Sequence, residues 1–243
     1  MQNFGNFAMK KGFTMAVILN IDTSTDSCSA ALTAEGMVLE HFEDFEYHNH
    51  AALLSDMIKG CLDHLRRHEM SLDAVAVTTG PGSYTGLRIG LSEAKGLAFS
   101  LDVPLIGVNT LELMAVKVMF SPEIECNELF APMIDARRME VYTAVYDMAL
   151  NQLLAPTPMI IDGESYSEFL ERGKVLFFGN GSAKTREIIT SPNAVFIPDV
   201  VPTAVDMLAL AERDFARRQF IDLAYSTPLY LKEFQATKPR KLF

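Results

Sequence analysis

The residues with the clearest chemical potential form a glycine-rich stretch, T-G-P-G-S-Y-T-G-L-R, over residues 79–88. It joins an apolar, strand-like run to a helix-like pattern. A glycine-rich loop at the start of a helix can bind an anion, because free backbone N–H groups and the helix dipole point toward it. Ser83 or Thr85 is expected to cap the helix. No Lys-Ser or Lys-Thr pair follows, so the stretch is not a P-loop. A tight strand–helix turn without a ligand is the simpler interpretation.

A second glycine element, Gly179-Asn180-Gly181, follows the apolar run 175–178 and precedes a predicted helix. It is compatible with a phosphate or adenosine contact, and a plain turn is the alternative. Asp22 and Asp135 each end an apolar run. They could flank a cleft and hold a magnesium ion through water, or serve only as turn residues. The candidate nucleotide-binding residues are therefore Asp22, Ser24, Gly82, Ser83, Asp135, Gly179 and Gly181.

The sequence predicts neither a catalytic residue nor a metal site. His64 and His68 have the i, i+4 spacing of a metal pair, but there is no HExxH motif and two arginines lie between them. A solvated helix end is the preferred interpretation of this pair. The chain also has no G-x-S-x-G elbow and no zinc-type cysteine cluster. We therefore expect no intrinsic cofactor, and ATP binding that is weak at most.

Two helices could serve a partner. Periodicity predicts a helix over residues 49–68 with one apolar stripe. In a second helix, over residues 85–101, small residues recur at every fourth position, which lets another helix approach closely. The two helices either pack on each other or also present a surface to another subunit. For that surface the candidate partner-interface residues are Leu53, Met57, Cys61, Gly86, Gly90, Ala94 and Ala98.

The strand pattern around these helices occurs twice. The chain opens with three predicted strands, the first ending at Asp22, over residues 16–21, 29–33 and 37–42. A similar series, with Asp135 after its first strand, runs over residues 129–134, 141–146 and 153–154. A period of this kind indicates two similar halves, each opening with a β-meander. We therefore predict an α/β, two-lobed, actin-like (ASKHA, ribonuclease-H-like) fold.

The remaining elements divide between two abutting lobes. Residues 1–14 are expected to be an N-terminal extension, 15–113 the first, partner-binding lobe, and 114–243 the second lobe. Further strands are predicted over residues 74–78, 103–108 and 175–178. Further helices are predicted over residues 109–119, 166–172, 183–189 and 205–220.

Composition limits the environment and the partners. The chain has 243 residues, 49% of them hydrophobic, which is enough for one large domain or two small ones. Lys and Arg total 21 against 31 Asp and Glu, a net charge of -10. Phosphate backbones repel such a chain, so we expect another subunit to hold any nucleic acid that it serves. The isolated Cys28, Cys61 and Cys126 indicate reduced thiols and a cytoplasmic protein, and no apolar run suggests a membrane span.

These segments together resemble the TsaB family, also called YeaZ. The resemblance covers residues 18–112, with I-L-N-I-D-T-S-T-D-S-C-S-A-A-L, G-P-G-S-Y-T-G-L-R-I-G-L-S-E-A-K-G-L-A-F and P-L-I-G-V-N-T-L-E, and continues more weakly over 133–147. The related, catalytic TsaD family binds a metal through two histidines of a V-N-H-L-E-G-H stretch. Here Thr110 and Met114 occupy the histidine positions. Neither side chain replaces imidazole as a ligand for a hard or borderline divalent metal.

The resemblance implies a non-catalytic scaffold or activator subunit of the complex that transfers threonylcarbamoyl to adenosine 37 of tRNA. It implies pairing with TsaD through the first-lobe helices as a four-helix bundle, with TsaE joining the complex and tRNA bound only through it. In isolation the same surface could form a homodimer. Two alternatives stay open, a metal-independent glycoprotease-like enzyme and a nucleotide-dependent enzyme of the actin-like superfamily.

Overall fold

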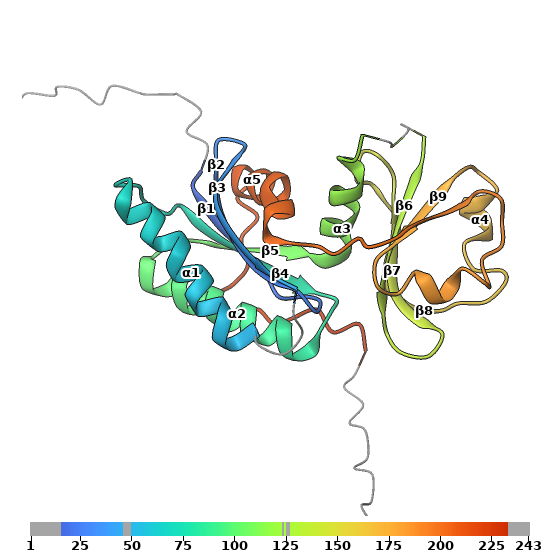
Figure 1. Ribbon diagram of the computed structural model, residues 1–243, viewed down its shortest axis with the longest axis horizontal. Helices are drawn as coiled ribbons and strands as arrows, with labels where there is room; N and C mark the ends of the chain where they lie inside the picture. Colours follow the sequence, from blue (N-terminus) through green and yellow to red (C-terminus); the bar gives the residue numbers. More distant parts are fainter. Residues whose placement is uncertain (1–15, 46–49, 123, 125–126, 233–243) are drawn as a thin grey trace, which may run out of the picture.

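The computed structural model describes residues 16–45, 50–122, 124 and 127–232, which form two five-stranded sheets joined by helices (Figure 1). Strand order is β3-β2-β1-β4-β5 in the first sheet and β10-β9-β6-β7-β8 in the second. This confirms the predicted two-lobed α/β architecture. The predicted N-terminal extension, residues 1–14, lies outside the described residues.

The elements follow one another in a regular order. The first lobe contains β1 (Ile18–Asp22), β2 (Cys28–Ala34), β3 (Met37–Asp44), α1 (His50–Arg67), β4 (Ala74–Gly80), α2 (Tyr84–Leu101) and β5 (Leu105–Asn109). Helix α3 (Thr110–Met119) leads to β6 (Leu129–Asp135), β7 (Glu140–Tyr146), β8 (Gln152–Ile160), α4 (Ser167–Leu170), β9 (Val175–Phe178), η1 (Ala183–Thr185) and β10 (Ala194–Ile197). The 3-10 helix η2 (Ala204–Met207) and helix α5 (Leu208–Ala216) follow.

Both lobes have the same strand pairing, which explains the repeat in the sequence. In each lobe the first three strands pair antiparallel, as the predicted meanders require. Two further strands then add in parallel, β4 and β5 in the first lobe and β9 and β10 in the second. The first strand of each sheet ends at Asp22 or Asp135, as predicted.

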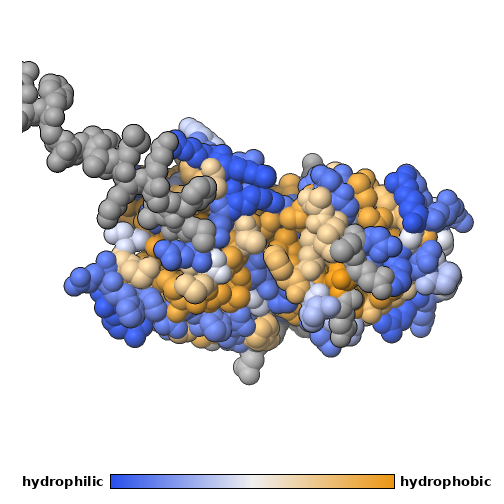
Figure 2. Space-filling view, turned by 90° about the horizontal axis from the view of Figure 1, so that it is seen from above, coloured by the Kyte–Doolittle hydropathy of each residue, from blue (hydrophilic) through white to orange (hydrophobic). Residues whose placement is uncertain are grey.

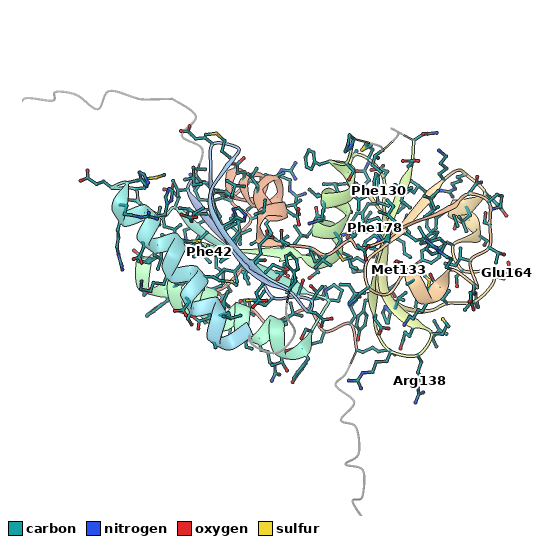
Figure 3. All side chains as sticks on the ribbon, viewed as in Figure 1. Phe42, Phe130, Met133, Arg138, Glu164 and Phe178 are labelled. Atoms are coloured by element: carbon teal, nitrogen blue, oxygen red, sulfur yellow. The ribbon has the colours of Figure 1, made fainter. Side chains whose placement is uncertain are left out.

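Helix α3 holds the two lobes together. Seven of its ten residues are buried, so it is covered on most sides rather than along one stripe. Leu113 and Val116 pack against the first sheet, whereas Met114 packs against the second together with Phe130 and Phe178. Figure 3 places these two phenylalanines on the side of the second lobe that faces α3. Helices α1 and α2 cover the outer face of the first sheet.

Helix α5 returns to the first lobe, although it follows the second lobe in sequence. Leu210 and Ala211 pack with Ile18 on the inner face of the first sheet. The Ala204 N–H donates to Ser29 Oγ on β2, at 2.9 Å. Residues 204–216, which the sequence division assigned to the lobe 114–243, therefore lie against the first sheet. An apolar stripe shows that a helix is half-buried, but not which of two sheets covers it.

The second lobe has less helix than the sequence predicts. The helix predicted over 166–172 is the four-residue α4, and that over 183–189 is only the 3-10 turn η1. Hydroxyl groups compete for the backbone there, since Thr185 Oγ1 donates to Ser182 O and Ser182 Oγ to Gly179 O, both at 2.8 Å. The helix predicted over 205–220 is divided into η2 and α5 and ends at Ala216. Strand β10 was not predicted.

One face of the molecule is polar toward its ends and more apolar in the middle (Figure 2). Seen from above, hydrophobic residues reach the surface between the two lobes, and hydrophilic residues dominate toward both ends (Figure 2). No helix in the described ranges combines the length and the apolar character needed to cross a membrane.

The start of α2 lies directly on the turn that follows β1. A Cβ atom at Gly86 would be 2.2 Å from Thr23 O, and one at Gly90 would be 2.3 Å from Thr23 Oγ1. Thr23 Oγ1 donates to Gly86 O at 2.7 Å, which fixes the contact. On the opposite side of the same helix, a Cβ at Gly96 would have no neighbour within 4 Å. The two sides of α2 therefore differ sharply in the space available.

This difference predicts opposite effects for one substitution at two positions of α2. Gly86→Ala should lower the free energy of unfolding by about 1–3 kcal/mol, because the methyl group overlaps a backbone oxygen. Gly96→Ala should raise it by up to about 1 kcal/mol, because alanine favours the helix and meets nothing. Chemical denaturation of both variants measures the effects. Equal changes at the two sites would show that close approach is not what Gly86 provides.

Candidate functional site

The carboxyl group of Asp22, at the end of β1, is fully buried between the first sheet and α2. Its Oδ1 accepts hydrogen bonds from Thr78 Oγ1 at 2.7 Å and from the Ser24 N–H at 3.2 Å. Burial raises the pKa of Asp22 to about 6, while the hydrogen bonds from Ser24 and Thr78 oppose the rise. Asp22 is therefore a nearly neutral-pH acid held inside the first lobe.

The glycine-rich stretch packs against the turn beside Asp22. Ser83 caps α2, as predicted, because its Oγ accepts from the Gly86 N–H at 3.2 Å. The Ser83 N–H itself donates to Ser24 O at 2.7 Å, and a Cβ at Gly82 would be 2.1 Å from the same oxygen. Contacts within the chain therefore account for these residues as a tight strand–helix turn. An anion-binding role for Gly82 and Ser83 stays a prediction.

The second glycine element lies on the end of β6. Gly179 has φ +95, and a Cβ there would be 2.3 Å from Met114 Cε. The Gly181 N–H donates to Met133 O at 3.0 Å, so this glycine also lies against its own chain. Only the three-residue η1 follows, and so short a turn offers little helix dipole. The helical context expected after Gly179-Asn180-Gly181 is thus absent, and nucleotide contact by these glycines stays a prediction.

The two aspartates that were candidates for a shared magnesium site have separate partners. Asp135 forms an ion pair with Lys184, and its N–H donates to Asn180 Oδ1 at 2.9 Å. Asp22 instead accepts its hydrogen bonds from Thr78 and Ser24, which belong to the first lobe. Within the described ranges, no group of three or more His, Cys, Asp or Glu side chains could hold a metal ion. His64 lies 3.3 Å from Glu40 Oε2, with its Nδ1 facing that oxygen.

The start of α3 shows what occupies the histidine positions of the TsaD pattern. Asn109 caps the helix, its Oδ1 accepting from the N–H groups of Leu111 at 2.9 Å and Glu112 at 3.2 Å. Thr110 and Met114 are 0% and 1% exposed. Met114 belongs to the core between α3 and the second sheet. These two positions therefore contribute packing, where the resemblance places metal ligands in TsaD.

The small-residue row of α2 faces inward. Gly86 and Gly90 contact Thr23, and Ala94 and Ala98 are fully buried in the core under α1 and α2. Of the α1 candidates, Met57 and Cys61 are buried in the same core, and Leu53 is half-buried against it. The row therefore serves the chain's own helix packing, and a part for these residues in a partner interface stays a prediction.

The opposite side of α2 is the accessible one. We call its residues Thr85, Ile89, Ser92, Gly96 and Phe99 the outer ridge; Ile89 is half-buried and the others are exposed. Phe99 has 80% of its surface exposed. Helix α1 borders the ridge on one side, where Ser55 Oγ donates to Glu93 at 3.1 Å. In the sequence these residues have the i, i+3, i+4 spacing of one helix face. Because polar, small and apolar residues alternate along that face, the spacing did not identify it as a candidate partner surface.

The cysteines agree with the expectation of reduced thiols. Cys28 and Cys61 are both buried thiols. Burial raises the pKa of each thiol to about 12, which leaves almost no thiolate at neutral pH. Cys126 lies outside the described residues. Neither described cysteine is therefore a candidate nucleophile.

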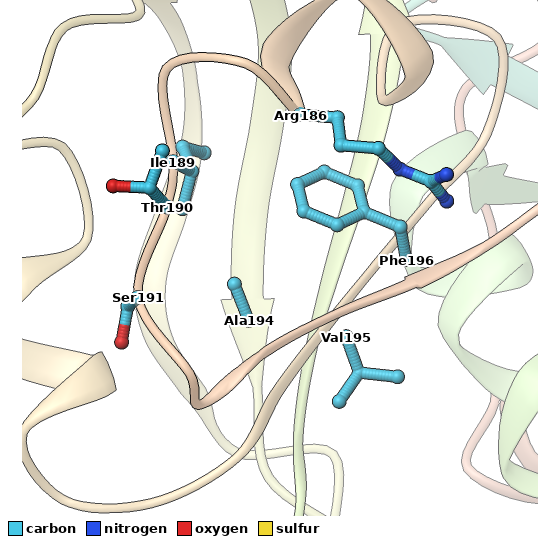
Figure 4. A pocket seen from close by; sticks show the side chains of 7 residues that line it. All are labelled: Arg186, Ile189, Thr190, Ser191, Ala194, Val195 and Phe196. Carbon is cyan, nitrogen blue, oxygen red and sulfur yellow. The ribbon is translucent and has the colours of Figure 1, made fainter.

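A shallow cavity of about 450 Å³ lies beside the edge strand β10, away from these residues (Figure 4). The Arg186 guanidinium lies 5.2 Å from the centroid of the Phe196 ring in its wall. Arg186 has no part in the Asp22 environment or in the outer ridge. The cavity is therefore not part of the candidate site.

Burial of Asp22 predicts a specific pH dependence. Since its pKa is higher in the folded state than the ordinary value of 3.8, the folded state binds the proton more tightly. Its contribution to stability is present at low pH and is lost as pH rises from about 4 to about 6. The stability difference between the protein and Asp22→Asn should change across this window by on the order of 2 kcal/mol, in favour of the variant at higher pH.

Urea denaturation of both proteins at pH 4.5, 5.5 and 7 checks this expectation. A difference that does not vary with pH would show that Asp22 titrates normally in the folded protein.

Proteins of the TsaB and TsaD families are similar to this chain in sequence. The family model of TsaD, the tRNA N6-adenosine threonylcarbamoyltransferase, matches residues 45–229. The Escherichia coli protein named tRNA threonylcarbamoyladenosine biosynthesis protein TsaB is 33% identical over 91% of this chain and 96% of its own length. The Bacillus subtilis protein of the same name is 31% identical over 71% of this chain and 74% of its own length.

Solved structures agree with this grouping. YeaZ from Pseudomonas aeruginosa superposes with a TM-score of 0.71 at 29% identity, over 89% of this chain and all of that chain. A second Pseudomonas aeruginosa structure, described as similar to peptidase YEAZ, has a TM-score of 0.75 at 29% identity and covers 90% of this chain and all of its own. The sequence match to TsaB proteins and the structural match to YeaZ both extend over most of the chain. The chain therefore belongs to the TsaB family.

Proposed function

We propose that this chain is the non-catalytic scaffold or activator subunit of the complex that transfers threonylcarbamoyl to adenosine 37 of tRNA. Its relatives are named for tRNA threonylcarbamoyladenosine biosynthesis, and TsaD is named as the transferase. The observation that carries the proposal is the burial of Thr110 and Met114, at positions where the resemblance places the metal-binding histidines of TsaD. A buried methionine methyl group against Gly179 leaves no imidazole and no open ligand position there.

The enzymatic alternatives receive less support. A glycoprotease-like activity needs an activated nucleophile, and the described cysteines are buried thiols with raised pKa values. A nucleotide-dependent activity needs free backbone donors at the glycine turns. The N–H groups of Ser83 and Gly181 instead donate to backbone oxygens of the chain itself. We therefore propose that the chain has no intrinsic cofactor and binds ATP weakly at most.

The catalytic partner in this proposal is TsaD, with TsaE as a third component. The outer ridge suits a helix of that partner, because Ser92 and Gly96 are small and Phe99 supplies apolar area. Together with α1 it would form half of a four-helix bundle, and a second copy of the chain could occupy the same surface in isolation. With a net charge of -10, tRNA contact is assigned to the complex rather than to this chain alone.

Reconstitution tests the division of roles. We expect purified chain, given tRNA and a threonylcarbamoyl donor, to form no modified adenosine, and addition of the chain to TsaD and TsaE from the same source to raise their rate. Mass spectrometry of digested tRNA measures the product. Modification by the isolated wild-type chain would overturn the proposal.

The partner surface has a test that separates binding from folding. Gly96→Gln should weaken association with TsaD by at least ~10-fold, because it adds a long side chain where backbones meet. The same change should leave the chain as stable or more stable, since glutamine favours a helix over glycine. Gly163→Gln is the matched control, because Gly163 also has nothing within 4 Å of an added Cβ but lies in the second lobe.

Association is measured by isothermal titration calorimetry and stability by thermal unfolding. Unchanged affinity in a folded Gly96→Gln variant would place the interface elsewhere.

A further inference from the structure

The segment after α5 returns along the first lobe and does not form a helix. We call residues 221–232 the C-terminal strap. It begins on the free edge of β5, where the Ile221 N–H donates to Leu105 O at 2.8 Å in an isolated antiparallel bridge. The Ile221 side chain covers Gly107, since a Cβ there would be 3.0 Å from Ile221 Cγ2. The strap is thus anchored to the first sheet at its start.

The strap then runs antiparallel to α2, with later strap residues beside earlier helix residues. Lys95 Nζ donates to Ser226 O at 2.6 Å, and Arg88 Nε donates to Tyr230 Oη at 2.8 Å. The Arg88 guanidinium also lies 4.1 Å from the centroid of the Tyr84 ring. These contacts border the outer ridge on the side opposite α1, so α2 is held between α1 and the strap.

The end of the strap reaches both the glycine-rich turn and the second lobe. The Leu229 N–H donates to Thr79 O at 2.7 Å, at the end of β4. Lys232 Nζ then lies 2.5 Å from the carboxylate of Glu140, the first residue of β7. Lys184 donates to the backbone oxygen of Glu140 at 2.6 Å. In Figure 1 the red segment passes below the first sheet and ends beneath the space between the lobes.

We propose that the C-terminal strap is an interlobe latch that fixes the second lobe relative to α2. The covalent links between the lobes run through α3 and through residues 198–203, and the strap adds a non-covalent link from α2 to the β6–β7 hairpin. Lys232 is 44% and Glu140 16% exposed, so their ion pair is partly screened by water. A link of this strength can open and close without unfolding either lobe.

Amide exchange in the isolated full chain tests whether the ion pair holds the strap. The Leu229 N–H reports directly, because its partner Thr79 O belongs to the first lobe. We expect Lys232→Glu to speed exchange at Leu229 by about 3- to 10-fold. The charge-swapped variant Lys232→Glu/Glu140→Lys should return the rate to within about twofold of wild type. Arg186→Glu, which makes the same charge change beside β10, should leave the rate unchanged.

Pulsed electron spin resonance tests whether the strap fixes the lobes. Labels at Arg66→Cys and Glu171→Cys, both exposed sites, report the distance between α1 and the turn after α4. A Cys126→Ser background leaves Cys28 and Cys61, whose buried thiols do not react near neutral pH. Lys232→Glu should broaden the distance distribution, and the charge swap should restore it.

Two results would overturn the latch: unchanged Leu229 exchange in Lys232→Glu, or faster exchange with an unchanged distance distribution. Circular dichroism confirms that each variant is folded. No partner or tRNA is present in these measurements, so their failure would leave the proposed scaffold function intact.

Discussion

The close approach of α2 to the turn after β1 is the constraint on which the rest of the first lobe depends. No Cβ atom fits at Gly82 or Gly86, because backbone oxygens of Ser24 and Thr23 occupy that space. With α2 at this distance, the Asp22 carboxyl group lies in a closed interior and its pKa rises. The same placement brings α2 into contact with α1 on one side and the C-terminal strap on the other. A larger residue in the glycine turn would disturb all of these together.

Local patterns in the sequence were sufficient to predict the first lobe and both meanders. Short strands with turn residues between them and a clear apolar stripe in residues 49–68 have few alternative structures. Prediction failed where contacts with distant parts of the chain determine the local structure. Strand β10 is short and mostly half-buried, so its sequence does not alternate clearly between apolar and polar residues. The helix expected over 183–189 is reduced to η1, where Thr185 and Ser182 bond to nearby backbone oxygens.

The candidate site shows the same limit at the level of single residues. Residue type limited the cap of α2 to Ser83 or Thr85, and the structure shows Ser83 in that position. The orientation of the small-residue row could not be predicted. A spacing of four shows which residues share a face of α2, but both an internal and an external helix contact require small side chains there. Burial of Ala94 and Ala98 decides for the internal contact.

An accessible surface on α2 remains because its neighbours cover every other side. The small-residue row packs toward the first sheet, and α1 contacts α2 at Glu93. The strap contacts α2 at Arg88 and Lys95. The outer ridge is therefore framed by elements whose positions are fixed, so a partner that binds it need order few side chains. Arg88 lies next to this ridge and also bonds Tyr230 of the strap. A partner on the ridge would thus contact the same helix that carries the link to the second lobe, which would give the scaffold subunit that we propose a physical route to influence an assembly.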